Sequence, residues 1–283
     1  MYTTIHENQP KEKIYWHAAF FEALQLELHQ YLDVLNFIDE HSLSKQALLI
    51  DVLVIKKEHN IKIEKNIGRI FRDINLFEFK SEKDILNVDD YNKVMGYAYL
   101  YASFTSVYIS DITVSFAVTV HPRDLLNYLE NDRKFKVTAF DDGICHIDGD
   151  AFPVQILESK KLSPEKNLFL KNLRSNLNRN DVQKVVEAYQ QLKGFESKNI
   201  YINRLMKANK SVFEEVLSMS ITKLEEIFVK IWAEENGWLD EIYHKVEIEK
   251  AKAIAKEMLL DGEPLDKIVK WTKLPHEIVR SLA

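Results

Sequence analysis

The amino-acid sequence predicts an α/β protein whose C-terminal part is entirely helical. Three observations support this fold class. An apolar helical segment is followed by short segments rich in Leu, Ile and Val, helix and strand patterns then alternate as far as residue 160, and beyond Pro164 only helical periodicity remains. We therefore expect an α/β domain over residues 1–160, a helical extension over 161–240 and a helical tail over 241–283.

The composition is that of an ordered protein. Of the 283 residues, 46% are hydrophobic and 29% are charged, and the formal net charge of −6 argues against a generic nucleic-acid coat. The single cysteine, Cys145, excludes an internal disulfide and fits a reducing compartment. The first residues lack a basic start followed by an apolar core, and no apolar run approaches the ~20 residues of a membrane span. We expect a cytoplasmic protein that is neither exported nor inserted in a membrane.

The first elements are a buried helix and two strands. The segment Tyr15–Leu32 is apolar on most of its circumference, which predicts a core helix. The segments Gln46–Lys57 and Ile74–Lys80 are rich in β-branched and large apolar residues, which predicts strands. A short strand near Ile61–Ile63 completes this part.

A helix and a strand follow. Asp89 or Asp90 is expected to cap a helix that continues over Tyr91–Phe104. The segment Thr113–Val120 is apolar without alternation, which predicts a strand covered on both faces.

The end of the α/β part reads as a helix and three strands. Pro122 suits the first turn of a helix that runs to Asn131. The segments Phe135–Phe140 and Ile144–Asp148 flank an Asp-Gly pair, which predicts a hairpin, and Phe152–Ser159 is the last strand. The order of elements is that of an α/β core.

The C-terminal part contains three predicted helices, over 167–177, 181–195 and 211–238, and a tail. In the tail, breaks at Gly262–Pro264 and Leu274–Pro275 separate short helices that resemble a helix-turn-helix. Eight Lys and Arg against seven Asp and Glu over residues 245–283 give a net charge of +1, which is far below that of a free-standing DNA reader. A packing or dimerisation hairpin is therefore favoured over DNA reading.

Three charged residues stand out in the strands. Asp51 lies inside LLIDVLVI, where a carboxylate without a partner costs several kcal/mol. Glu78 and Lys80 share one face of the next strand, because side chains alternate, while Phe77 and Phe79 share the other. If the two strands are neighbours, Asp51, Glu78 and Lys80 converge at one edge of an apolar sheet.

This arrangement suits phosphodiester hydrolysis. Two carboxylates, Asp51 and Glu78, match the oxygen ligands that Mg²⁺ or Mn²⁺ takes, and Lys80 is placed to orient or help deprotonate the attacking water and to offset charge on phosphorus. On spacing alone, a buried ion pair that only satisfies itself is an equally good interpretation.

A third carboxylate is expected from the first helix. Glu22 lies in its most apolar part and continues into a narrow polar stripe with Gln25 and His29. Glu27 is the competing choice, and the stripe also fits a solvated helix edge. We place Glu22 ahead.

Two segments are basic. Residues 56–72 contain six Lys and Arg and two Glu, and residues 158–180 have the same count. Such segments draw phosphates towards an acidic pocket, although a solvated basic face fits equally well. The predicted nucleic-acid contacts are Lys56, Lys57, Arg69, Arg72, Tyr91 and Lys93.

The sequence contains only 7 glycines and no phosphate-binding glycine loop. We therefore expect no nucleotide cofactor.

Asp51, the Glu78–Lys80 triplet and the following DDYNKVMGYAYLY resemble the PD-(D/E)XK nuclease superfamily. More narrowly, the chain is similar to the Rpn-type recombination-promoting nucleases and putative transposases of bacteria. The similarity extends over WHAAFFEALQLELHQY, IGRIFRDINLFEFKS, NLFLKNLRSNL and the tail AKEMLLDGEPLDKIVKWTKLPHEIV. Two departures are Ile50, where the superfamily has its proline, and the long separation of 27 residues between Asp51 and Glu78.

The resemblance implies a restriction-endonuclease-like αβββαβ core and Mg²⁺-dependent DNA cleavage. It gives Glu22 the role of a first-helix carboxylate, Asp51 and Glu78 those of metal ligands, and Lys80 that of the catalytic lysine. The leading hypothesis is thus a DNA endonuclease linked to recombination or a mobile element. The alternatives are an inactive nuclease-fold module that binds DNA or protein, and a structural or regulatory homodimer built on the helical C-terminal half.

Overall fold

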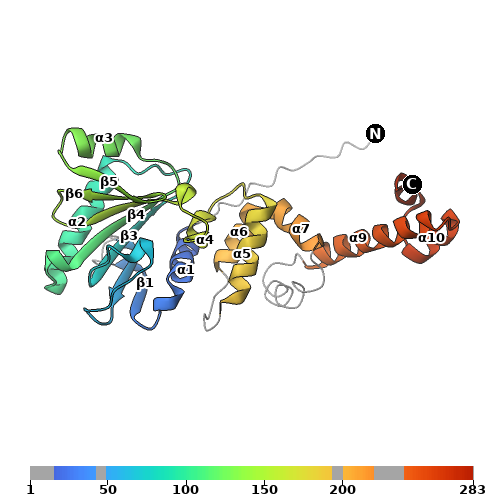
Figure 1. The fold of residues 1–283 in the computed structure, drawn as a ribbon, viewed down its shortest axis with the longest axis horizontal. Helices are drawn as coiled ribbons and strands as arrows, with labels where there is room; N and C mark the ends of the chain where they lie inside the picture. The colour runs from blue at the N-terminus through green and yellow to red at the C-terminus, as the bar shows by residue number, and fades with distance from the viewer. Residues whose placement is uncertain (1–15, 43–48, 193–199, 220–238, 283) are drawn as a thin grey trace, which may run out of the picture. The chain divides into compact units, whose positions relative to one another are not determined.

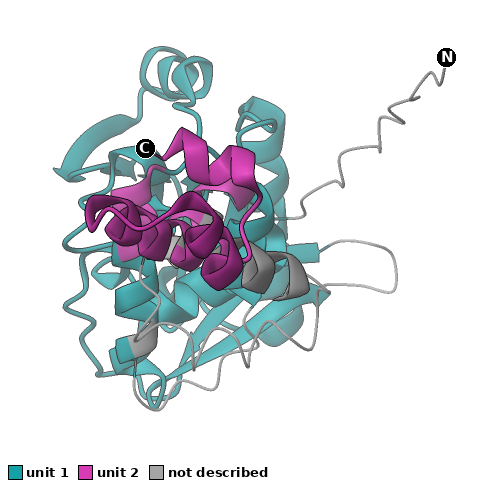
Figure 2. Ribbon diagram, turned by 90° about the vertical axis from the view of Figure 1, so that its right-hand side faces the viewer, with its two compact units in different colours: residues 1–177, 184–209 teal, residues 178–183, 210–283 magenta. Residues whose placement is uncertain are grey.

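The computed structural model describes residues 16–42, 49–192, 200–219 and 239–282. The chain divides into two compact units, which are residues 1–177 with 184–209, and residues 178–183 with 210–283 (Figure 2). The first unit therefore continues well past residue 160, where we predicted the α/β domain to end. No helix among the described residues has both the length and the apolar character that a membrane span needs.

The first unit is built on a mixed seven-stranded sheet (Figure 1). The strands are β1 (Leu35–Ser42), β2 (Leu49–Lys56), β3 (Ile74–Lys80), β4 (Ile112–Val118), β5 (Lys136–Asp141), β6 (Ile144–Asp148) and β7 (Val154–Glu158). Their order across the sheet is β1-β2-β3-β4-β7-β6-β5, in which β3, β4 and β7 are parallel and the other neighbours antiparallel. The predicted α/β class is confirmed, and β4 is buried along its whole length as expected.

Helices cover both faces of this sheet. Helix α1 (His17–Glu27) lies on one face, where Phe20 stacks on Phe79 with ring centroids 4.7 Å apart. Helices α2 (Val88–Thr105) and α3 (Arg123–Asn131) lie on the other face, in a core that includes Leu53 and Leu76 of the sheet. The two sets of helices lie on opposite sides of the sheet (Figure 1). Because side chains alternate along a strand, successive residues point to an α1 face and an α2 face.

Strand β1 was not predicted. Its sequence LNFIDEHS mixes polar and apolar residues because it is an edge strand, and only Leu35 is fully buried. The predicted strand near Ile61–Ile63 is not formed. The strand predicted over Gln46–Lys57 corresponds to β2, with residues 46–48 outside the described residues.

Helix α2 is present as predicted, but it begins earlier, at Val88, and has a different cap. The side chain of Asn87 accepts a hydrogen bond from the backbone N–H of Asp90 at 2.9 Å, so Asn87 is the N-cap in place of Asp89 or Asp90. Both aspartates lie in the first turn, where the helix dipole stabilises negative charge.

The chain between β2 and β3 crosses the α1 face of the sheet. It contains the short 3₁₀ helix η2 (Asn66–Gly68), and the carbonyl of Ile67 accepts a hydrogen bond from Gln155 Nε2 at 2.8 Å. Gln155 lies on this face because its strand neighbours Val154 and Ile156 belong to the core under α2.

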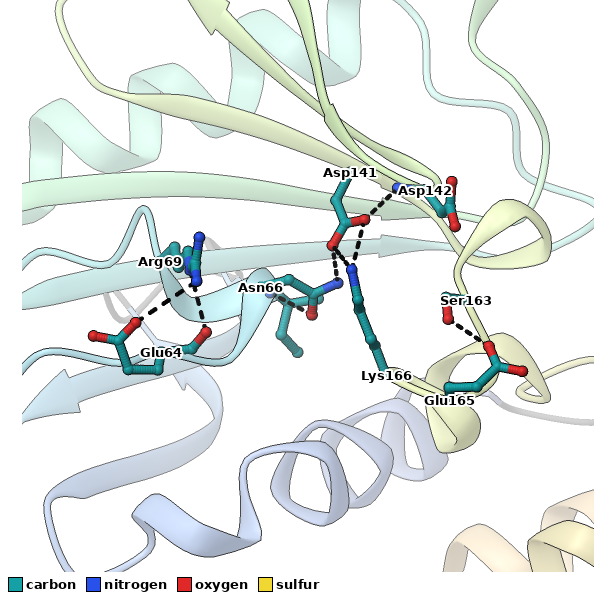
Figure 3. Close-up of polar contacts among 9 residues, drawn as sticks. Glu64, Asn66, Arg69, Asp141, Asp142, Ser163, Glu165 and Lys166 are labelled. Atoms are coloured by element: carbon teal, nitrogen blue, oxygen red, sulfur yellow. Dashed lines mark hydrogen bonds and ion pairs between the residues drawn. The ribbon is translucent and has the colours of Figure 1, made fainter.

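This crossing segment is fastened to the β5–β6 hairpin (Figure 3). Asn66 Nδ2 donates to Asp141 Oδ2 at 3.0 Å, and Lys166 Nζ lies 2.9 and 2.8 Å from the two carboxylate oxygens of Asp141. These hydrogen bonds, with that from the Asp142 N–H, lower the pKa of Asp141 to about 2.

The described residues after β7 are mainly helical, as predicted. Only four residues of the helix predicted over 167–177 form an α-helix, however, and the helix over Ile200–Ala208 was not predicted. The elements are η4 (Ser159–Lys161), α4 (Leu168–Lys171), α5 (Arg179–Gln191), α6 (Ile200–Ala208), α7 (Lys210–Met219), α9 (Leu239–Leu260), α10 (Leu265–Thr272) and α11 (His276–Ser281). Of the helix predicted over 211–238, residues 220–238 lie outside the described residues. The predicted terminal hairpin is present, because α10 and α11 pack on α9 around Ala255, Ile268, Leu274 and Val279.

Candidate active site

The structure brings Asp51, Glu78 and Lys80 together. Strands β2 and β3 pair antiparallel with Val52 opposite Phe77, so the next position places Asp51 opposite Glu78 on the same face. Lys80 Nζ lies 3.3 Å from Glu78 Oε1, and Asp51 Oδ2 accepts the backbone N–H of Phe79 at 2.8 Å. The three side chains thus converge as predicted, at the end of the sheet where β2 begins and β3 ends.

Strand periodicity explains which way these side chains face. Phe77 and Phe79 pack against Phe20 of α1, with Phe79 stacked on it. The intervening side chains of Glu78 and Lys80 must then point to the α2 face, where the first turn of α2 meets the end of β3.

Lys80 is held by three carboxylates. Its Nζ lies 3.3 Å from Glu78 Oε1, 3.3 Å from Asp84 Oδ2 and 3.0 Å from Asp90 Oδ1, and only 7% of the residue is exposed. Burial alone would lower the pKa of Lys80, but the hydrogen bond with Asp90 and the charges of Glu78 and Asp84 outweigh burial and raise it. Lys80 is therefore a fixed cation at neutral pH and no proton acceptor.

Asp51 and Glu78 are carboxylates in an unfavourable environment. Burial, followed by repulsion from Asp51, raises the pKa of Glu78 to about 7 despite the nearby Lys80. Burial also raises the pKa of Asp51 and outweighs the hydrogen bond from the Phe79 N–H. A divalent cation between the two carboxylates would relieve this repulsion.

The donor set fits a cation that keeps most of its water. Within the described ranges, no group of three or more His, Cys, Asp and Glu side chains is arranged to hold a metal ion. Asp51 and Glu78 would therefore supply two ligands, and Mg²⁺ is commonly bound by one or two carboxylates with water and substrate oxygens in the other positions. The residues present fit Mg²⁺ better than a metal that needs a closed protein cage.

His17 is a neighbour that the sequence did not reveal. It is the first residue of α1, its Nε2 lies 3.6 Å from Asp51 Oδ2, and its ring meets the ring of Phe79 edge-on at 6.0 Å. Half of its side chain is exposed. The only available signal was its position directly before an apolar helix, which by itself indicates no function.

Glu22 serves another part of the molecule. Its helix packs on the α1 face, whereas Glu78 and Lys80 point to the α2 face. Glu22 is buried, and its carboxylate accepts the backbone N–H of Tyr201 at 2.5 Å, at the start of α6. The prediction of Glu22 as the third carboxylate must be revised, because helix-dipole and hydrogen-bond stabilisation of α6 account for it.

Glu27, the competing choice, has a similar role. It is buried and accepts the backbone N–H groups of Phe169 and Leu170, at 2.6 and 3.0 Å. Lys65 Nζ lies 2.9 Å from its other oxygen. Burial raises the pKa of Glu27 even so.

The predicted contacts Lys56, Lys57, Arg69 and Arg72 lie away from the cluster. Lys56 is five residues along β2 from Asp51, which corresponds to ~17 Å at ~3.3 Å per residue. Arg69 follows η2 on the α1 face and is paired with Glu64, whose Oε2 lies 3.7 Å from its guanidinium (Figure 3). This basic segment therefore lies apart from Asp51, Glu78 and Lys80, contrary to our expectation that it flanks them.

Tyr91 and Lys93 have different outcomes. Tyr91 is fully buried, stacks on Phe116 and donates its hydroxyl to Asp150 Oδ2 at 2.7 Å, so the predicted contact with substrate must be revised. Lys93 is exposed, and its charge partly opposes the rise in the pKa of Asp51 and Glu78 that burial causes. Lys93 stays a predicted contact.

Comparisons of the chain with protein-family models, curated proteins and solved structures find no match. The resemblance to PD-(D/E)XK nucleases stays a prediction. The chemistry of the site must be argued from the geometry of Asp51, Glu78 and Lys80.

Proposed function

We propose that this protein is a Mg²⁺-dependent DNA endonuclease that hydrolyses phosphodiester bonds. The observation that carries the proposal is a pair of carboxylates, the partly buried Asp51 and the buried Glu78, which repel each other beside the fixed cation Lys80. The element order α1-β1-β2-β3-α2-β4 supports a restriction-endonuclease-like core, and Mn²⁺ would serve in place of Mg²⁺. A link to recombination or a mobile element belongs to the same proposal.

The roles of the residues follow from their positions. Asp51 and Glu78 would hold the cation, which when bound favours ionisation of water and offsets phosphate charge. The oxygen of water forms a bond to phosphorus and its proton passes to solvent. The bond from phosphorus to the leaving deoxyribose oxygen breaks, and this oxygen takes a proton from solvent. Lys80 stabilises the charge that develops on the phosphoryl oxygens, and Asp84 and Asp90 hold its ammonium group in place.

The charge of this cluster sets the expected order of binding. Asp51, Glu78, Asp84 and Asp90 lie near Lys80 and Lys93, so the cluster has an excess of carboxylates. Phosphate would be repelled from such a cluster until a cation is bound. DNA affinity is therefore expected to increase when a divalent cation is added.

A plasmid-nicking assay tests the proposal. Wild type should convert supercoiled DNA to nicked or linear forms with Mg²⁺ or Mn²⁺, whereas Lys80→Ala and Asp51→Asn should not. Glu22→Gln is a matched control, since it removes a buried carboxylate outside the cluster. Equal cleavage by wild type and Lys80→Ala, or none by either across several DNA substrates and metals, contradicts the proposal.

A binding module without cleavage is the second candidate. It is favoured by the way Glu78, Asp84 and Asp90 surround Lys80, which is also how a buried ion cluster satisfies itself. This alternative predicts DNA binding that is salt-sensitive and unchanged in Asp51→Asn, together with no cleavage by wild type.

A further inference from the structure

Because the basic segment 56–72 lies apart from Asp51, Glu78 and Lys80, other residues must contact the DNA phosphates. The carboxyl ends of the three parallel strands β3, β4 and β7 meet at the edge where the cluster lies, and ligands of open α/β sheets bind outside such ends. Lys80 pairs with Val118, and Val118 pairs with Glu158. Glu158 therefore lies level with Lys80 on the same face, two strand spacings or ~10 Å away.

A second group of charged side chains surrounds Glu158. His121 Nδ1 lies 2.9 Å from Glu158 Oε1, and Lys161 Nζ lies 2.7 Å from Glu158 Oε2. Beside them, Lys160 Nζ lies 3.2 Å from Glu82 Oε1. We call these five residues, His121, Glu158, Lys160, Lys161 and Glu82, the strand-end surface.

The basic side chains of the strand-end surface are exposed. The side chains of His121, Lys160 and Lys161 are 46%, 48% and 57% exposed. Ion pairs at such exposure contribute little to stability, so a phosphate oxygen can replace the carboxylate as the partner of each lysine.

The backbone beneath these lysines is fixed. Lys171 Nζ donates to the carbonyls of Lys160 and Leu162 at 3.0 and 2.7 Å. The backbone of this segment also packs closely against Gly143, which has a φ of +70°. A Cβ at this position would lie 2.6 Å from Leu162 N and 2.8 Å from Glu158 O, so only glycine fits here. The lysine stems therefore start from a defined position, which lowers the entropy lost on binding.

We propose that the strand-end surface binds the DNA phosphates next to the scissile phosphate, with Lys160 and Lys161 as the main contacts and His121 as a further donor. The inference rests on the proposed function, since it assumes that the scissile phosphate lies at Asp51, Glu78 and Lys80. Under this proposal the phosphate contacts are made by Lys160 and Lys161, and the basic segment 56–72 makes none.

The chain offers a matched pair of dilysines for the test. Lys160→Ala/Lys161→Ala is compared with Lys56→Ala/Lys57→Ala by fluorescence anisotropy of a labelled short DNA duplex in Ca²⁺, over a series of salt concentrations. A denaturing gel after each titration shows whether the duplex is intact. We expect the Kd of the 160/161 variant to rise ~10-fold and the slope of log K against log salt to shrink by about 2, with the 56/57 variant near wild type.

A charge-preserving variant separates phosphate binding from folding. Lys160→Arg/Lys161→Arg keeps both charges and should bind DNA like wild type. If the alanine variant unfolds at a lower temperature than wild type, Lys160→Gln/Lys161→Gln takes its place, because glutamine keeps most of the side-chain length and an N–H donor group while removing the charge.

The outcomes distinguish the two proposals. Wild-type binding and cleavage that are unchanged in the 160/161 variant, or lost instead in the 56/57 variant, overturn the strand-end surface and leave the endonuclease proposal standing. A wild type that binds DNA, loses this binding in the 160/161 variant and cuts nothing supports the surface and overturns the endonuclease. Absence of both binding and cleavage in wild type overturns both.

Discussion

The first unit contains two pairs of carboxylates that differ in their partners, and all of these residues are buried except Asp51, which is partly buried. Glu22 and Glu27 of α1 each accept backbone N–H groups at the start of another helix. Asp51 and Glu78 instead face each other across two strands, and burial and mutual repulsion raise the pKa of Glu78 to about 7. The comparison teaches that burial of a carboxylate does not identify a functional site, because the partner of the carboxylate decides whether its charge is already stabilised.

The largest expected difference between the pairs is in catalysis. Asp51→Asn and Glu78→Gln should lower the rate of plasmid nicking by ~10³-fold, because each removes a ligand of the cation. Glu22→Gln and Glu27→Gln should cleave at a rate close to wild type after correction for the folded fraction. A loss of cleavage in Glu22→Gln as large as that in Asp51→Asn would contradict the assignment of different roles to the two pairs of carboxylates.

The second difference is in the free energy of unfolding, where replacing a member of the α1 pair should be more harmful than replacing Glu78. Glu27→Ala leaves the N–H groups of Phe169 and Leu170 and the ammonium of Lys65 without their partner, so it should lower the free energy of unfolding by ~2–4 kcal/mol. Glu78→Gln removes repulsion with Asp51 and should not lower it at pH 8. Urea unfolding of both variants measures this, and a Glu78→Gln variant as unstable as Glu27→Ala would refute the account of repulsion.

The third difference is in pH dependence. The folded pKa of Glu78, about 7, lies above its ordinary value of 4.5, so the folded state binds more protons than the unfolded state between these values. Stability from this group is therefore greatest below pH 4.5 and is lost as the pH rises through 7, by at most ~3 kcal/mol. Urea unfolding from pH 5 to pH 8 should show this decrease in wild type and a smaller one in Glu78→Gln. Parallel pH profiles for the two proteins would contradict it.

The smallest expected effect concerns His17. It touches only one oxygen of the Asp51 carboxylate, which keeps its hydrogen bond from the Phe79 N–H. His17→Ala should therefore lower the nicking rate by only a few-fold, ~1 kcal/mol in transition-state free energy. A loss as large as that of Asp51→Asn would make His17 a full member of the catalytic group.

Strand residues of the site were predictable and helix residues were not. The period of two assigns Glu78 and Lys80 to one face without knowledge of the fold, and an aspartate in an apolar strand needs a partner nearby. Helix α1 is apolar nearly all round, so its sequence does not show which of its residues lie near Asp51, Glu78 and Lys80. The prediction of Glu22 as a member of this cluster failed for that reason. His17 is distinguished only by its position in space.

The remaining errors come from the path of the chain. The basic segment 56–72 is adjacent in sequence to β2 and β3, but it crosses the face of the sheet opposite Glu78 and Lys80. Strand β1 is an edge strand whose exposed residues break the apolar pattern. Neither feature can be deduced from local periodicity, because both depend on which elements cover which face.

Calorimetric titration with Mg²⁺ tests the central claim most directly, which is that Asp51 and Glu78 together form a cation site. Wild type and Glu22→Gln should bind one Mg²⁺ with the same affinity, and Asp51→Asn and Glu78→Gln should show no saturable heat. Binding by Asp51→Asn equal to that of wild type would contradict the account.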